Sequence, residues 1–105
     1  MKNLGELYTL GIWSVKPGNE RAFIDAWQSF ADWTCKHQSG AVHAVLLQDT
    51  EQPQRFISYG PWNDEKSIKE WRQRTEFQEF LKRARALCDN IEPLMMQSVA
   101  HVASH

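Results

Sequence analysis

Four residues on predicted strands have side chains that could act on a small aromatic molecule. Trp62 carries an indole N–H that can donate to a ligand oxygen, and Ser58, on the same strand, offers a hydroxyl. His43 and His101 lie on two other predicted strands, and an imidazole can accept the proton of a phenol near neutral pH. We therefore predict these four as the catalytic groups: hydrogen-bond donors beside an ionised oxygen, and a base that ionises it.

Each of these residues also has a plainer interpretation, which the sequence leaves open. Trp62 fits equally as a core residue at a corner between a strand and a helix. His43 and His101 also fit as solvent-facing or hydrogen-bonded structural residues. Their positions relative to a cavity would separate the two interpretations.

Neighbouring strand residues supply the candidates for substrate contact. Phe56 and Gly60 have the same parity as Trp62, so they should lie on the same face of the sheet. Tyr8 and Trp13 lie on opposite faces of the first strand, so only one of them can line a pocket there. We predict Phe56, Gly60, Trp13 and Tyr8 as the substrate-binding set, subject to that restriction.

The sequence lacks the motifs that hold nucleotide cofactors or metals. It contains no GxGxxG turn and no P-loop, and its four histidines share no helical spacing with carboxylates. Cys35 and Cys88 have no CxxC spacing and are expected to be reduced, packed residues. We therefore predict neither a cofactor nor a metal.

Oxygen chemistry without a cofactor is reasonable when the substrate itself is the reductant. A phenolate or enolate can pass an electron to O2, so the protein need only bind the flat ring, favour loss of its proton and exclude water. A dry aromatic pocket with hydrogen-bonding groups beside the ionised oxygen would suffice. Five tryptophans in 105 residues supply the aromatic part more clearly than the hydrogen-bonding part.

The elements that position these residues are predicted in the order β-α-β-β-α-β. The predicted strands are 7–15, 41–49, 55–62 and 94–103, and the predicted helices are 22–36 and 64–91. Thr75 and Gln78 match a capping box that would bend the second helix, and Tyr59 and Trp71 should pack between helices and sheet. The order is that of the ferredoxin-like α+β fold, a four-stranded antiparallel sheet with both helices on one face.

Apolar residues occur on both faces of the predicted strands. Trp13 and Ile12 lie on opposite parities of the first strand, as do Phe56 and Ile57 on the third. Because two helices cover only one face, the other face should meet the sheet of a second copy, and we predict a homodimer. Side chains of mixed size, with Gly11 among tryptophans, should leave an apolar cavity between the two sheets.

Length and charge exclude several classes of protein. The 105 residues predict one domain, 1–105, and 12 Lys and Arg against 13 Asp and Glu give a net charge of −1. That balance gives no net positive electrostatic field to attract the phosphates of a nucleic acid. No apolar run approaches the ~20 residues of a membrane span, and the first residues lack a signal-peptide block. We expect a cytoplasmic protein without nucleic-acid or membrane partners.

A family resemblance adds to this interpretation. The residues that carry it are Val15-Lys16-Pro17-Gly18, Glu20, Phe23, Gly40, Leu46-Leu47, Arg55-Phe56-Ile57-Ser58-Tyr59, Trp62, Ile68, Trp71, Thr75 and Phe77. In this order and spacing the chain resembles the antibiotic biosynthesis monooxygenase (ABM) domain proteins of the dimeric α/β-barrel superfamily. The resemblance implies a ferredoxin-like homodimer, a dimeric α/β barrel, with a pocket between helices and sheet in each subunit.

The resemblance also bears on chemistry. Some members look like cofactor-independent oxygenases that turn a phenol or dihydroquinone into a quinone with O2, and others degrade haem or process signalling molecules. The family's tryptophan after the third strand matches Trp62, whereas some quinone-forming relatives carry an asparagine where this chain has Ser58. Three positions of the haem-degrading branch fall on Gly11, Trp62 and Leu81, and only the tryptophan matches. That branch is therefore less favoured.

We predict a monooxygenase that oxidises a planar phenolic or quinol-type molecule with O2 in an apolar pocket. The alternative is a non-catalytic dimer of the same fold that binds such a ligand. An acid or base inside the cavity would favour the enzyme.

Overall fold

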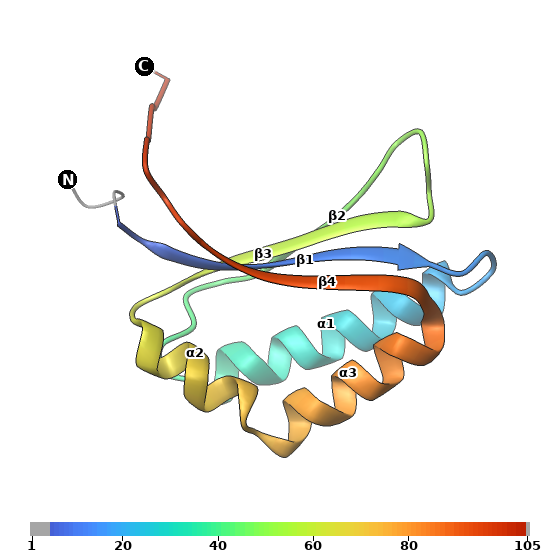
Figure 1. Cartoon of the computed structure of the whole chain (residues 1–105), viewed down its shortest axis with the longest axis horizontal. Helices are drawn as coiled ribbons and strands as arrows, with labels where there is room; N and C mark the ends of the chain where they lie inside the picture. The colour runs from blue at the N-terminus through green and yellow to red at the C-terminus, as the bar shows by residue number, and fades with distance from the viewer. Residues whose placement is uncertain (1–4, 105) are drawn as a thin grey trace.

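All helices lie beneath one face of an antiparallel sheet in the computed structural model, which describes residues 5–104 (Figure 1). The elements in chain order are β1 (Leu7–Val15), α1 (Glu20–His37), β2 (Val45–Gln48), β3 (Arg55–Trp62), α2 (Glu65–Arg72), α3 (Thr75–Leu87) and β4 (Cys88–Gln97). Because α2 and α3 together form the predicted bent helix, the order β-α-β-β-α-β and the ferredoxin-like α+β fold are confirmed.

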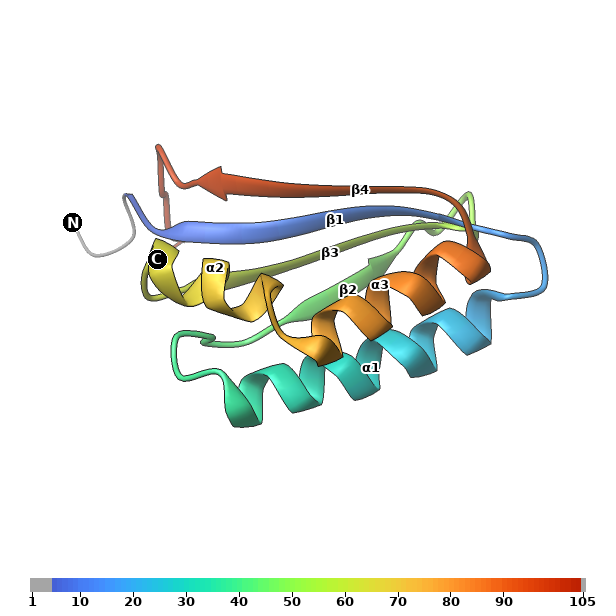
Figure 2. The ribbon, with the colours of Figure 1, turned by 60° about the horizontal axis from the view of Figure 1, so that its bottom comes forward.

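The sheet has the strand order β2-β3-β1-β4, and each neighbouring pair is antiparallel. Figure 2 shows α1, α2 and α3 on the same side of it. The register sets Gly11 opposite Ser58 and Thr9 opposite Gly60, so small residues of β1 and β3 lie side by side. Small side chains at the middle of the covered face leave room there for the large ones that the helices supply.

The turn between α2 and α3 is built differently from the predicted capping box. The carboxylate of Asp64 accepts a hydrogen bond of 2.7 Å from a backbone N–H in the first turn of α2, as an N-cap should. Thr75 is the first helical residue of α3, and Arg74 before it makes no side-chain cap. The Gln78 side-chain amide instead donates to the carbonyl of Arg72 at 2.8 Å. That bond joins the two helices across the bend.

The fourth strand begins six residues before the predicted start, because β4 is Cys88–Gln97 and not 94–103. The helical spacing of Leu87, Cys88 and Ile91 made the helix look longer than it is. Pro93 lies within β4, which is an edge strand and can tolerate a proline. The predicted boundary was therefore wrong because a short apolar run fits both periods.

Two predicted strand histidines lie outside strands. His101 follows β4 in residues 98–104, which form no strand and are largely exposed, with Val99 at 85% and Val102 at 94%. His43 precedes β2, which is Val45–Gln48 and shorter than the predicted 41–49. Both errors come from apolar residues that continue the strand pattern beyond the hydrogen-bonded ladder.

The uncovered face of the sheet is apolar. Tyr8 and Tyr59 contact each other there, with ring centroids 6.5 Å apart, so Tyr59 does not pack between helices and sheet as predicted. Ile57, Leu47 and Met96 share this face with them and are exposed. The helix-facing side, by contrast, holds the buried core. A sheet with two apolar faces and helices on one of them leaves an apolar surface open to solvent.

Candidate active site

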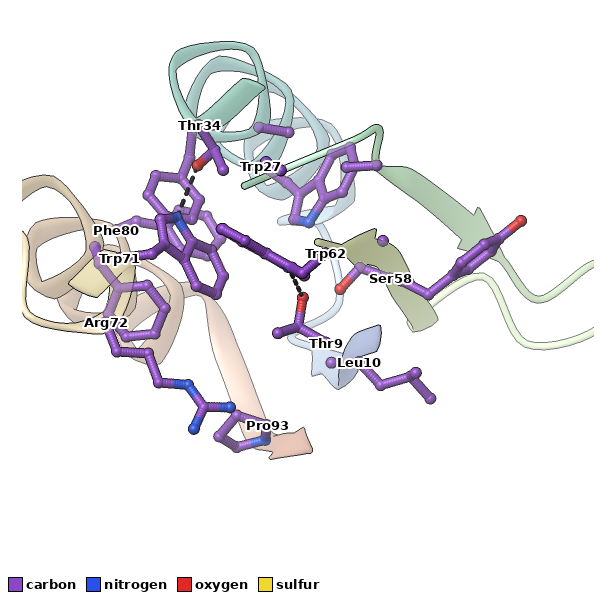
Figure 3. A pocket seen from close by; sticks show the side chains of 18 of the residues that line it. Thr9, Leu10, Trp27, Thr34, Ser58, Trp62, Trp71, Arg72, Phe80 and Pro93 are labelled. Atoms are coloured by element: carbon purple, nitrogen blue, oxygen red, sulfur yellow. Dashed lines mark hydrogen bonds between the residues drawn. The ribbon is translucent and has the colours of Figure 1, made fainter. Parts of the chain in front are cut away.

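A cavity of about 90 Å³, taken as the space open to the centre of a water molecule, lies between the helices and the sheet (Figure 3). This is the position that the family resemblance implied, inside one chain, and not the space between two sheets that the strand pattern predicted. Its lining comes from β1, β3, β4 and all three helices and is mostly apolar. None of the described residues that line it carries a carboxylate, whereas Arg72 brings a guanidinium and His43 an imidazole.

Trp13 on β1 is fixed over the middle of the sheet. Its indole lies so close to Gly11 that a Cβ there would be 2.6 Å from three ring atoms. Phe23 and Phe80 hold the ring from the helix side, with centroids 5.2 and 5.7 Å away. Its N–H donates to the Ser58 hydroxyl at 3.0 Å. Since the Ser58 oxygen accepts this bond, its own proton remains to be donated elsewhere.

Two further indoles make the same kind of bond. Trp62 donates to the Thr9 hydroxyl at 3.0 Å, and Trp71 donates to the Thr34 hydroxyl at 2.9 Å, as the dashed lines in Figure 3 show. The two rings contact each other with centroids 4.9 Å apart. The Trp62 N–H is thus already satisfied within the chain, whereas the sequence suggested that it would be free to bind a ligand. In these pairs the hydroxyl protons, and not the indole N–H groups, are the donors left over. Trp27 also lines the cavity, and its indole N–H makes no hydrogen bond within residues 5–104.

The structure brings three of the four predicted catalytic residues to the cavity. Trp62, Ser58 and His43 line it, the first two buried and His43 with an exposed side chain at the rim. His101 does not line it, because β4 has ended before that position. The arrangement therefore offers hydrogen-bond donors inside and an imidazole only at the edge.

The predicted substrate-binding residues divide between the two faces of the sheet. Trp13 and Gly60 line the cavity, and Tyr8 lies on the uncovered face, so Trp13 is the one of that pair that can contact a ligand. Phe56 shares the helix-facing side but packs against Phe23, with centroids 5.2 Å apart, and does not line the cavity. Gly60 cannot be larger, because a Cβ would collide with the backbone carbonyl of His43.

Sequence reasoning missed several residues of the cavity. Thr9 and Thr34 hold the indoles, and a signal existed, since each is a hydroxyl residue in an otherwise apolar stripe. Phe30 and Phe80 stack with centroids 4.5 Å apart and planes within 4°. No sequence pattern pointed to Arg72 as a cavity residue, because it lies among other charged residues on a short helix.

The thiols are poor nucleophiles in this setting. Burial, with a smaller contribution from Asp89, raises the pKa of Cys88 to about 11. Cys35 lies at the cavity but is exposed and not packed as predicted; partial desolvation of its thiol, and then the charge of Asp32, raises its pKa. Thiols with raised pKa values stay protonated and unreactive near neutral pH.

Residues 5–104 show neither a metal site nor a membrane-spanning helix. They contain no group of three or more His, Cys, Asp or Glu side chains placed to hold a metal ion. Within the same range, no helix has the length and apolar character to cross a membrane.

Comparison with known proteins decides the family. Residues 9–83 match the family model described as antibiotic biosynthesis monooxygenase. The chain belongs to the antibiotic biosynthesis monooxygenase family. A search of curated proteins found none that matches this chain.

Solved structures of similar fold include named members of the family. The chain is similar to SnoaB, a cofactor-independent oxygenase from Streptomyces nogalater (17% identity, TM-score 0.85, covering 95% of this chain and 99% of that one). It is also similar to a putative antibiotic biosynthesis monooxygenase from Nitrosomonas europaea (16% identity, TM-score 0.81, 90% and 91%). A conserved protein from Methanosarcina mazei Go1 is a third such structure (18% identity, TM-score 0.82, 91% and 95%). At these identities the likeness establishes the fold.

The site of this antibiotic biosynthesis monooxygenase family member can do a limited range of chemistry. Its aromatic walls can hold a flat ring, and the Ser58 and Thr9 hydroxyls can donate to an oxygen on that ring. Without a carboxylate in the described lining, proton removal by a side chain falls to His43.

Proposed function

We propose that this protein binds a planar phenol or quinol-type molecule in the cavity and oxidises it with O2 without a cofactor. The observation that carries the proposal is the cavity itself, walled by indole and phenyl rings and supplied with a buried hydroxyl at Ser58. An apolar pocket with few convergent polar groups is the usual form of a small-molecule site. The similarity to SnoaB supports the same class of reaction.

The bond between Trp13 and Ser58 supports stabilisation of an ionised substrate oxygen. The indole N–H polarises the Ser58 hydroxyl, and a polarised hydroxyl is a better donor to a phenolate. Ser58 is only 8% exposed, so its bond to the substrate would be little weakened by water. Preorganised donors of this kind act where negative charge develops.

The reaction then needs only the substrate and O2. His43 at the rim accepts the phenolic proton, and the ionised ring passes one electron to O2. Recombination places a hydroperoxide on a ring carbon, and loss of water leaves a carbonyl there. One oxygen atom enters the product and the other leaves as water.

We also propose that the protein is a homodimer, sheet against sheet. The uncovered face carries exposed Ile57 and Met96 beside half-buried Tyr8 and Tyr59. Each large apolar side chain withdrawn from water contributes about 1.5–3 kcal/mol, so a few from each copy would offset the cost of association. Analytical ultracentrifugation should give a dimer at micromolar concentration, and Ile57→Lys should give monomer. A wild-type monomer would refute this part.

A non-catalytic binder is the second candidate, and one observation favours it. The described lining holds no carboxylate, and its only imidazole, at His43, is exposed. A site without an enclosed base can hold a phenol without ionising it.

Oxygen uptake separates the two candidates. Metal-free protein is mixed with panels of dihydroquinones and hydroxyanthrones, and O2 consumption is followed with an electrode. Catalysis predicts a rate above buffer that Ser58→Ala lowers about 10–100-fold, since removal of one donor to a developing oxyanion has effects of that order or more. Tight binding of panel members with no rate above buffer would establish the binder instead.

A further inference from the structure

Arg72 is the one permanently charged group among the described residues that line the cavity. It is the last residue of α2, and its side chain is half-buried. Figure 3 shows the guanidinium extending past Trp71 toward Pro93 of β4. A cation placed there is held against apolar surface and is only partly solvated.

Arg72 has no anionic partner among the described residues. The ion pairs found within residues 5–104 join other residues, such as Lys69 with Glu65 on the same helix. Its guanidinium makes no hydrogen bond within residues 5–104. A half-buried guanidinium with five unused N–H donors is suited to a bidentate bond with a carboxylate or similar oxyanion.

The position of Arg72 separates it from the proposed reacting oxygen. In Figure 3 Arg72 and Ser58 lie on opposite sides of Trp62. A ring stacked along Trp62 would therefore present different substituents to the two residues. One end would meet the hydroxyl donor and the other the guanidinium.

We infer that Arg72 binds an anionic substituent of the substrate, so that the substrate class is an aromatic or quinol ring with a carboxylate or comparable oxyanion remote from Ser58. The inference rests on the proposed function for the location of the ring. Arg72 sets specificity by its charge and takes no part in the transfer of protons or electrons.

Two redox-inert probes of nearly equal shape test the inference. 2-Naphthoate carries a carboxylate where 2-naphthamide carries a neutral amide, and calorimetry gives the Kd of each. The wild-type protein should bind naphthoate about tenfold more tightly, the effect of about 1.4 kcal/mol expected of a charge-assisted bond at a half-exposed site. The preference should weaken as salt is added.

Variants assign the preference to Arg72. Arg72→Gln should abolish it while leaving the Kd of naphthamide unchanged, and Arg72→Lys should keep part of it. Arg83→Gln removes an equal charge from an exposed position on α3 and should leave both constants unchanged. Circular dichroism verifies that each variant is folded.

The outcomes distinguish this inference from the proposed function. Equal binding of both probes by wild type, or a preference that survives Arg72→Gln, overturns the role of Arg72 and leaves the cavity proposal standing. If neither probe binds, both the role of Arg72 and the cavity proposal are overturned. A preference that depends on Arg72 in a protein without oxygen uptake supports the charged ligand class and refutes catalysis.

Discussion

The bond between Trp13 and Ser58 gives the sharpest test of how the cavity is held. Ser58→Ala removes the acceptor of an indole N–H on a residue that is only 6% exposed. A buried donor left without a partner costs about 1–3 kcal/mol, more than the bond itself contributes. We therefore expect Ser58→Ala to lower the free energy of unfolding by that amount.

A double-mutant cycle isolates the bond. Trp13→Phe removes the donor, and in that background Ser58→Ala removes a hydroxyl on which no indole depends. The second substitution should then be nearly neutral, since both partners have been replaced by apolar groups. The expected coupling free energy is therefore about 1–3 kcal/mol, well above the ~0.5 kcal/mol within which independent sites are additive.

The assay is urea unfolding followed by far-UV circular dichroism, which does not depend on indole fluorescence. All variants are measured at one protein concentration, because dimerisation would make stability depend on it. Ser14→Ala, on β1 but on the uncovered face, serves as the matched control and should change little in either background. Additive effects of Ser58→Ala and Trp13→Phe would refute the reasoning.

Three further predictions follow from the same contacts. Gly11→Ala should cost about 1–3 kcal/mol by overpacking, since the new Cβ would meet the Trp13 indole at 2.6 Å, and urea unfolding should show most of the penalty relieved in a Trp13→Leu background. Thr34→Val should cost about 1 kcal/mol in the same assay, because it removes the acceptor of Trp71. Cys88 should react slowly with an alkylating reagent at pH 8 and faster toward pH 11, because its pKa is raised from 9.0 to about 11. The folded state holds the thiol proton more tightly than the unfolded state, so the free energy of unfolding should keep this contribution below pH 9 and lose it as the pH rises from 9.0 to about 11. Cys88→Ala should lack that loss.

The sequence was informative where one periodicity ran without competition. Leu7–Val15 and Arg55–Trp62 were predicted with their observed bounds, because turn residues flank each run. The parity of β3 also put Ser58, Gly60 and Trp62 correctly on one face. The prediction of secondary structure failed around Cys88–Gln97, where apolar residues at helical spacing concealed the start of an edge strand.

The site was less predictable than the fold because it depends on contacts between distant elements. Parity can place Trp13 and Ser58 on the covered face, but only the register between β1 and β3 makes them partners. The same holds for Trp71 and Thr34, which lie on different helices. Hydrogen-bond partners 37 and 45 residues apart leave no local pattern. The prediction that the Trp62 N–H would be free to bind a ligand was wrong for this reason.

The pairing of indoles with hydroxyls also constrains how the cavity can change. Trp13, Trp62 and Trp71 each donate to a hydroxyl whose own proton remains available, so these three indoles need no water to complete their hydrogen bonds. A flat ligand can therefore displace solvent from around these three indoles without leaving their N–H groups unpaired, which removes a common cost of binding. Replacing Thr9 by Val would restore that cost, because the Trp62 N–H would then need water or the ligand itself as its acceptor. Affinity for an apolar ring should fall in Thr9→Val, whereas a ligand with an acceptor oxygen near Trp62 should be retained.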